Sequence, residues 1–146
     1  MKIYLDNCAL SRPFDNQSQE RIRLETEAIM VILSRMQRKE WVWLGSQALQ
    51  MEIDQMPDPG HRSRLRRISE RVSQSVVIGK KELDRARELE KSGFAGFDAV
   101  HLACAESGKA DVFITTDDRL LKLAKRQAGQ LQVKVDNPLS WIRENL

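Results

Sequence analysis

The sequence has little cysteine, no repeated or low-complexity tract and no long hydrophobic run. Only two of its 146 residues are cysteines, Cys8 and Cys104, and neither lies in a Cys-x-x-Cys motif. This excludes a disulfide framework, and a reduced, cytoplasmic protein is expected. No stretch of about 18 apolar residues occurs, which excludes a transmembrane helix and predicts that the protein has no membrane partner.

The composition is that of a folded domain with a mild positive charge. Hydrophobic residues make up 41% of the chain, which is enough to build a core and excludes a wholly disordered protein. The length fits one domain over residues 1–146. The net charge of +3 permits a nucleic-acid partner without requiring one.

Segments with strand-like and helical patterns alternate along the chain. Strands are predicted at residues 2–5, 41–44, 76–78, 111–114 and 131–135, and helices at about 18–39, 46–55, 60–73, 80–91, 97–106, 118–127 and from 138 onward. Residues 10–14 are predicted to be a loop because they include Pro13. The alternation predicts an α/β fold, a three-layer α/β/α sandwich with a mainly parallel five-stranded sheet.

Two acidic residues directly follow predicted strands. Asp6 comes after the first strand, and Asp117 comes after the fourth strand and a pair of threonines. Because parallel strands end at the same edge of a sheet, where ligands bind in such folds, both carboxylates are expected at that edge. The alternative for each residue is a turn position or a helix N-cap.

Two further acids stand on helix faces that should be apolar. Glu52 lies on the stripe that begins with Leu49 and ends with Met56, where a carboxylate is costly unless it is paired or binds a metal. Asp98 stands in the first turn of the apolar segment 97–105, where the helix dipole offsets only about 0.3–1 kcal/mol of the cost of burial. The alternatives are a Glu52 that reaches solvent and an Asp98 that only caps its helix.

A gathering of these four acids in one pocket would form a metal site. Carboxylates that close would repel one another, and divalent cations remove the conflict. All-oxygen ligation favours Mg²⁺ or Mn²⁺, and the chain has no His/Cys pattern typical of zinc sites. Such a site suits the hydrolysis of a phosphodiester bond.

Five motifs spread over almost the whole chain occur in a recognisable order. They are Leu5-Asp6-Asn7-Cys8, the helix that carries Glu52, Gly96-Phe97-Asp98-Ala99-Val100-His101-Leu102-Ala103, Ile114-Thr115-Thr116-Asp117-Asp118, and Val135-Asp136-Asn137-Pro138. Together they resemble the PIN-domain signature. The resemblance implies a Rossmann-like α/β/α fold and a Mg²⁺- or Mn²⁺-dependent endoribonuclease that hydrolyses RNA. It also implies a VapC-like toxin of a type II toxin–antitoxin pair, with an antitoxin protein as partner and a homodimer as a common assembly.

The resemblance assigns roles to individual residues. The implied catalytic acids, which would bind the metal, are Asp6, Glu52, Asp98 and Asp117. Asn7 and Thr115 match supporting positions, and Asp118 is implied to be either an extra ligand or a helix cap. Two positions depart from the family pattern, since Cys8 replaces a small hydroxyl residue and Leu120 replaces a frequent aromatic one. Neither departure removes a carboxylate.

Basic residues and one histidine have two interpretations each. Arg12 is predicted to bind a substrate phosphate, and the alternative is an ion pair with Asp15. The arginines within residues 62–71 fall on more than one helix face and either bind RNA or face solvent. His101 lies one turn after Asp98 and is either its hydrogen-bond partner or, as we predict, a satisfied core residue.

Two other functions fit parts of the pattern. One is a non-catalytic PIN-like module that binds RNA or protein, which would leave the four acids without a role. The other is a phosphotransferase of the haloacid-dehalogenase or receiver type, which also places an Asp after the first strand. Asp6-Asn7-Cys8 lacks the second acid that those families place nearby. We therefore predict a ribonuclease, with the non-catalytic module as the alternative.

Overall fold

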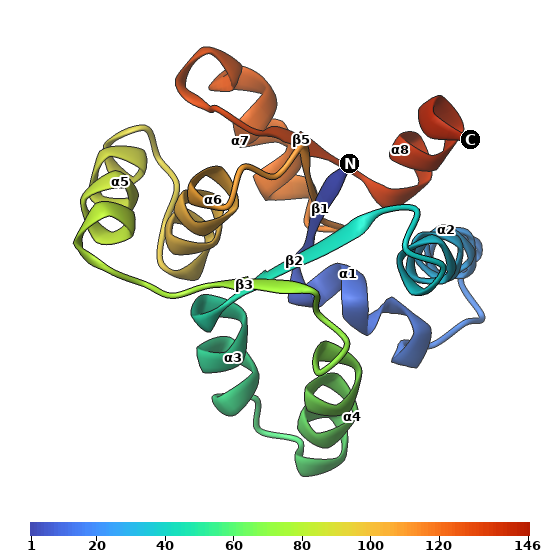
Figure 1. The fold of residues 1–146 in the computed structure, drawn as a ribbon. Helices are drawn as coiled ribbons and strands as arrows, with labels where there is room; N and C mark the ends of the chain where they lie inside the picture. The colour runs from blue at the N-terminus through green and yellow to red at the C-terminus, as the bar shows by residue number, and fades with distance from the viewer.

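Five parallel strands lie at the centre of the structure, a computed structural model that describes residues 1–146 (Figure 1). In chain order the strands are β1 (Lys2–Leu5), β2 (Val42–Ser46), β3 (Gln74–Val76), β4 (Val112–Ile114) and β5 (Lys134–Asp136). Their order in the sheet is β3-β2-β1-β4-β5, and every pairing is parallel. This confirms the predicted α/β fold with a parallel five-stranded sheet.

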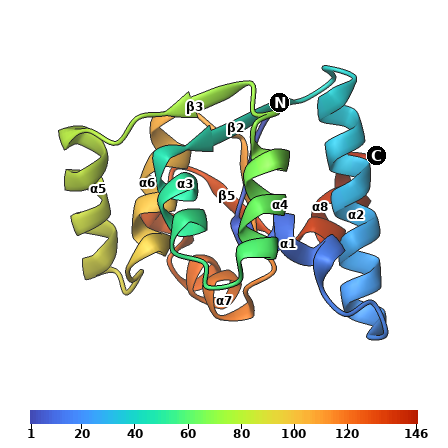
Figure 2. The ribbon, with the colours of Figure 1, turned by 90° about the horizontal axis from the view of Figure 1, so that it is seen from below.

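Helices cover both faces of the sheet. One face carries α1 (Asn7–Ser11), α2 (Glu20–Gln37), α4 (Pro59–Ser69) and α8 (Pro138–Asn145), and the other carries α5 (Lys80–Lys91), α6 (Phe97–Ser107) and α7 (Asp118–Arg126) (Figure 1 and Figure 2). The helix α3 (Gln47–Asp54) contacts both α4 and α6, and two short 3-10 turns are η1 (Arg12–Phe14) and η2 (Ala128–Gln130). None of these helices is both long and apolar enough to cross a lipid bilayer.

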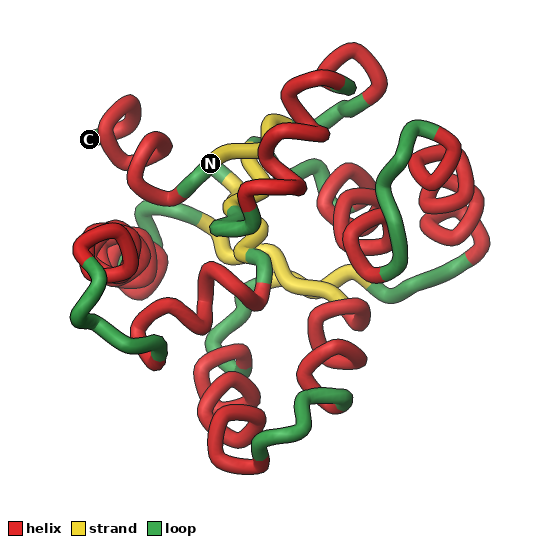
Figure 3. Tube along the Cα trace, turned by 180° about the vertical axis from the view of Figure 1, so that it is seen from behind, coloured by secondary structure: helices red, strands yellow, loops and turns green.

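Alternate residues of β1 point into two separate cores. Ile3 and Leu5 belong to the core beneath α2 and α8, whereas Tyr4 belongs to the core beneath α6. These three side chains are at most 1% exposed, as expected for a strand that is covered on both faces. Figure 3 shows the strands enclosed by helices. The buried central strand therefore fixes the positions of the residues at its carboxyl end.

The prediction of a loop over residues 10–14 is wrong. The chain forms α1 directly after β1 and continues into η1. Pro13 lies in the first turn of η1, where a backbone N–H has no partner within the helix and its absence costs nothing. The proline that suggested a loop is therefore compatible with a helical turn.

The two edge strands are displaced from their predicted positions. The third strand covers 74–76 rather than 76–78, and Val77 is 67% exposed. The N–H of Ile78 donates to Oε1 of Gln47 at 2.8 Å instead of joining the sheet. The fifth strand begins at residue 134, because η2 precedes it. An edge strand pairs on one side only, so its apolar residues do not fix its limits.

The chain changes faces of the sheet between β1 and β4. The helices after β1 cover one face, whereas α7 after β4 covers the other. In parallel α/β sheets, such a switch point opens a crevice beyond the carboxyl ends of the strands. The N–H of Asp6 donates to the carbonyl oxygen of Ile114 at 2.9 Å, which fixes the first residue after β1 against the end of β4.

Candidate metal centre

Asp6 lies at the carboxyl end of β1, and its carboxylate does not cap the helix that follows. It occupies the N-cap position of α1, but its side chain accepts no cap hydrogen bond. Instead, Oδ2 accepts hydrogen bonds from Oγ1 of Thr115 at 2.9 Å and from Sγ of Cys8 at 3.3 Å. The residue is only 6% exposed. Both side chains that support this carboxylate orient it toward the crevice rather than toward the helix.

The environment of Asp6 opposes a lone negative charge. Burial raises the pKa of this carboxyl group, and the charge of Glu52 raises it further. The attraction of His101 and the hydrogen bonds from Thr115 and Cys8 act in the opposite direction. A cation near Asp6 would remove the penalty that burial imposes.

Glu52 reaches the same place from α3. This helix starts at Ser46, whose Oγ accepts a hydrogen bond from the N–H of Leu49 at 3.3 Å. Oε1 of Glu52 accepts a hydrogen bond from Nδ2 of Asn7 at 2.8 Å and lies 3.3 Å from Nε2 of His101. Partial burial alone would raise the pKa of Glu52, but the hydrogen bond and attraction of His101, together with Asn7, hold it below its ordinary value. Glu52 therefore favours the ionised form that a metal requires.

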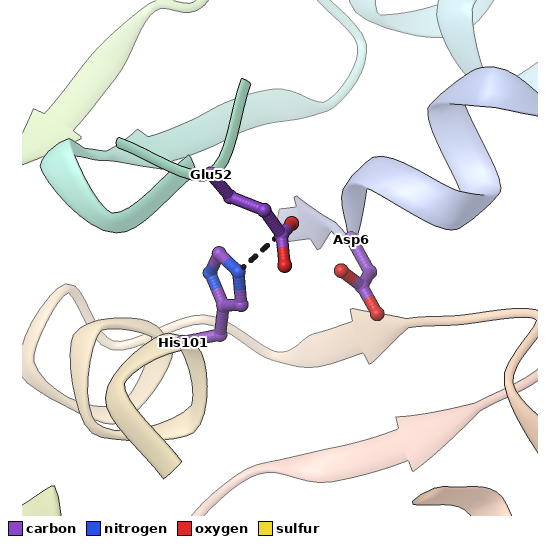
Figure 4. Close-up of side chains that lie close together, drawn as sticks. All are labelled: Asp6, Glu52 and His101. Carbon is purple, nitrogen blue, oxygen red and sulfur yellow. Dashed lines mark hydrogen bonds and ion pairs between the residues drawn. The ribbon is translucent and has the colours of Figure 1, made fainter. Parts of the chain in front are cut away.

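His101 is, as predicted, a buried residue with a partner at each ring nitrogen, and it also joins the centre, which the sequence did not reveal. The ring is fully buried, and Nδ1 lies 2.7 Å from the hydroxyl of Tyr4, which in turn lies 2.6 Å from Oγ of Ser46. The other ring nitrogen faces Glu52 rather than Asp98. Figure 4 shows His101, Glu52 and Asp6 pointing toward one another, and one ligand atom from each lies within 4.8 Å of the others. The position three residues after Asp98, on the same helix face, was the available signal.

Asp98 lies in the first turn of α6 on the opposite side of the centre. Burial raises its pKa to about 6, and the negative charges of Asp6, Asp117 and Glu52 contribute to the increase. His101 opposes it. The four carboxylates line one pocket. The predicted convergence at one edge of the sheet is therefore present in the structure.

Asp117 has two roles in the geometry. Its Oδ1 caps α7 by accepting hydrogen bonds from the N–H groups of Arg119 at 2.9 Å and Leu120 at 3.3 Å. The residue also lines the acidic pocket. Oγ1 of Thr115 accepts a hydrogen bond from the N–H of Asp117 at 3.2 Å while donating to the carboxylate of Asp6. A single threonine thus positions two of the four acids.

A pocket of about 430 Å³ contains all four carboxylates. Its lining residues are Asp6, Asn7, Cys8, Ser11, Glu52, Met56, Pro57, Asp58, His61, Asp98 and Asp117. Asp118 lies outside this set, and its two oxygens accept hydrogen bonds from Arg21 at 2.7 Å each. Arg12 also lies outside it and pairs at 2.9 Å with both Asp15 and Glu25. These pairs use Nε and Nη1 of Arg12, and the phosphate contact stays a prediction.

Comparison with known proteins identifies the family of this fold and site. The chain matches the PIN domain over residues 3–126. The chain belongs to the PIN-domain family. Its structure is similar to a chain in the crystal structure of VapBC2 from Rickettsia felis bound to a DNA fragment from their promoter, with a TM-score of 0.58 and 13% identity over 94% of this chain and 98% of that chain. At this identity the similarity concerns the fold alone. No curated protein sequence matches the chain.

PIN domains are generally nucleases, and the donor set of this PIN domain fits a divalent metal. Carboxylate oxygens are the ligands that Mg²⁺ and Mn²⁺ prefer, and one imidazole nitrogen is compatible with Mn²⁺. Asp6 and Glu52 would hold the ion, and His101 would join them in the tautomer that carries its proton on Nδ1, beside Tyr4, since the three ligand atoms already lie within 4.8 Å of one another. Asp98 and Asp117 complete the acidic wall of the pocket.

Proposed function

We propose that this PIN domain is a Mg²⁺- or Mn²⁺-dependent endoribonuclease and the toxin of a type II toxin–antitoxin pair. The observation that carries the proposal is the convergence of four carboxylates, from four separate segments, on one pocket at the switch point of the sheet. Membership of a family whose domains are generally nucleases supports the reaction class. A metal bound there would supply positive charge to the phosphodiester and lower the pKa of the attacking water.

The residues of the chain have distinct tasks in this proposal. Asp6, Glu52, Asp98 and Asp117 provide the negative charge that retains the metal. Asn7 holds Glu52 and Thr115 holds Asp6, so that one oxygen of each carboxylate remains free of protein hydrogen bonds. Preorganised ligands of this kind need little rearrangement when the ion and the substrate arrive.

The toxin assignment rests on the structural similarity to a chain from a VapBC complex. That complex is bound to promoter DNA, and we propose that an antitoxin protein likewise binds this chain. We propose RNA as the substrate, and membership of a family of nucleases supports a nucleic acid as the substrate class. A homodimer stays a prediction.

Cleavage of RNA by the purified protein tests the proposal. We expect Mn²⁺-dependent cleavage by the wild type, loss of cleavage after chelation with EDTA, and at least a hundredfold loss in Asp6→Asn and in Asp98→Asn, as expected for removal of a metal ligand. Asp84→Asn, on the exposed surface of α5, serves as the control.

Titration calorimetry with Mn²⁺ separates the nuclease from a non-catalytic module. A nuclease should bind Mn²⁺, and the affinity should fall in Asp98→Asn. Full cleavage by both site variants would refute the assignment of these acids. An absence of cleavage, with no Mn²⁺ binding that depends on Asp98, would instead indicate the non-catalytic module.

A further inference from the structure

A second pocket adjoins the acidic one and has the opposite charge on its outer wall. Its volume is about 610 Å³, and it shares Asp98 and Asp117 with the metal centre. Arg119, Lys122 and Arg126 line it from α7. The carboxylates of Asp98 and Asp117 therefore lie between the acidic pocket and the row of cations.

The three cations form a regular row on α7. They are spaced three and four residues apart, which places them on one helix face over about 10 Å of helix axis. All three are exposed, and none makes an ion pair with an acidic side chain. The neighbouring Lys125 points elsewhere, because it lines a different pocket beside β5. The row is thus a property of one face of α7.

Several other basic groups near the centre already have partners. Arg21 pairs with Asp118 at 2.7 Å. On α4, Arg66 pairs with Asp54 at 2.6 Å, and Arg62 donates to the carbonyl oxygen of Met56 at 2.7 Å. The cations of α7 lack such partners, so they keep their charge available for an anion.

The opposite wall of the second pocket is formed by residues with small side chains. It includes Gly93 and Ala95, from the loop between α5 and α6. The backbone of Gly93 has a φ of 102°, in the left-handed region that favours glycine. Figure 2 shows α7 beside α6, at the edge where this loop enters α6. A narrow groove with one basic wall and one smooth wall suits a flexible chain that carries regularly spaced negative charges.

We infer that this groove, lined by Arg119, Lys122 and Arg126, binds the phosphates of a single RNA strand next to the bond that is cut. The inference rests on the proposed function. A row of about 10 Å matches a few successive phosphates of one strand. An acidic protein segment is the other anionic chain that the row could hold, but nothing requires such a segment to lie beside the metal centre. A phosphodiester must reach that centre in order to be cleaved.

The matched pair Lys122→Gln and Lys125→Gln tests the groove, because both change one exposed lysine of the same helix. Binding of a fluorescein-labelled 12-nucleotide single-stranded RNA is measured by anisotropy in EDTA, where cleavage is prevented. Counterion release from a single strand contributes about 0.7 to the salt slope for each phosphate contact, or about fivefold in affinity at about 0.1 M salt. We therefore expect about fivefold weaker binding for Lys122→Gln and no change for Lys125→Gln.

The triple variant Arg119→Gln/Lys122→Gln/Arg126→Gln extends the test. Binding should weaken about a hundredfold at about 0.1 M salt, and the slope of log K against log [salt] should fall by about 2. Equal RNA affinities of Lys122→Gln, Lys125→Gln and the wild type would overturn the inference. So would a triple variant that loses binding of a poly-glutamate peptide but retains binding of RNA.

The same experiments distinguish failure of the groove from failure of the nuclease. A wild type that neither binds nor cleaves RNA would overturn the proposed function and the groove with it. A wild type that cleaves RNA, with the Lys122→Gln and Lys125→Gln variants alike in affinity and in KM, would overturn the groove alone.

Discussion

In the metal-free protein, the negative charge of Asp98 is unfavourable. Its carboxyl group is partly buried and faces three other acids, which together raise its pKa to about 6. At neutral pH the group is mostly ionised in spite of this. Replacement by asparagine keeps the shape of the side chain and removes the charge. We therefore expect Asp98→Asn to stabilise the metal-free protein while it abolishes cleavage.

The magnitude follows from the pKa. The increase from the ordinary value of 3.8 to about 6 corresponds to about 3 kcal/mol at about 1.36 kcal/mol per pKa unit. Solvent screening at a partly exposed carboxylate reduces this figure. The dipole of α6 stabilises the charge by about 0.3–1 kcal/mol, which also reduces the gain expected from its removal. We expect a net gain of about 1–2 kcal/mol, or about 3–6 °C in melting temperature for a chain of this length.

The pH dependence gives the sign of the effect. Between pH 3.8 and about 6, folded Asp98 holds a proton that the unfolded chain has released, so folding is favoured by protonation there. The cost of the charge is absent below pH 3.8 and fully present above about pH 7. The advantage of Asp98→Asn should therefore be largest at pH 7–8 and vanish as the pH falls toward 4.

Thermal unfolding in EDTA, followed by circular dichroism from pH 4 to pH 8, measures the difference. Asp84→Asn is the control, because Asp84 lies on the exposed surface of α5 and its ion pair with Arg87 contributes little. Added Mn²⁺ should raise the melting temperature of the wild type more than that of Asp98→Asn, because the metal binds the folded state. An Asp98→Asn variant that is no more stable than the wild type at pH 8 would refute the reasoning.

Three further substitutions test the packing, the buried ion pairs and the ligand set. A Cβ at Gly108 would lie 2.5 Å from a leucine methyl group, so Gly108→Ala should lose about 1–3 kcal/mol in urea unfolding. Gly129→Ala, with no atom within 4 Å of its Cβ, should change by less than about 0.5 kcal/mol; equal effects would contradict this packing. Glu25 is 1% exposed and pairs with two arginines, so Glu25→Ala should cost about 3–5 kcal/mol in thermal unfolding, and a loss below about 1 kcal/mol would argue against the ion pairs. His101→Asn removes the ring nitrogen that faces Glu52 and should lower Mn²⁺ affinity by about 10–100-fold in calorimetry, whereas unchanged affinity would exclude His101 from the ligand set.

The sequence pattern predicted β1 and β4 better than the edge strands, whereas the central strand β2 extends two residues beyond its predicted end at residue 44. β1 and β4 pair on both sides and are buried on both faces, so their apolar runs coincide with the strands. At the edges, apolar character and strand pairing separate. Val133 is only 6% exposed and packs into a core, yet it precedes β5. A residue can be buried without belonging to the sheet, and hydropathy does not distinguish the two situations.

The acids of the centre were predictable because their positions depend on simple geometry. Asp6 and Asp117 follow strands that end at one edge, and Asp98 interrupts an apolar helix. The place of His101 in the centre was not predictable, because an imidazole in an apolar helix is compatible with a core position. Its membership of the centre depends on its contact with Glu52 from another helix. The cap formed by Asp117 shows that one carboxylate can fill a structural role and still line the pocket.

Which cations remain available for a substrate depends on tertiary pairing. Arg21 and Asp118 are 97 positions apart in the chain, and Arg21 binds an acid that the family pattern offered as an extra ligand. The most arginine-rich helix, α4, is partly occupied in the same way by Asp54 and by a backbone carbonyl. Charge density along the sequence points to α4, whereas the unpaired charge beside the metal centre lies on α7. The proposed nuclease needs cations close to the carboxylates that act on the polyanion, so the proposal selects basic residues by their position relative to the acids and not by the number of arginines.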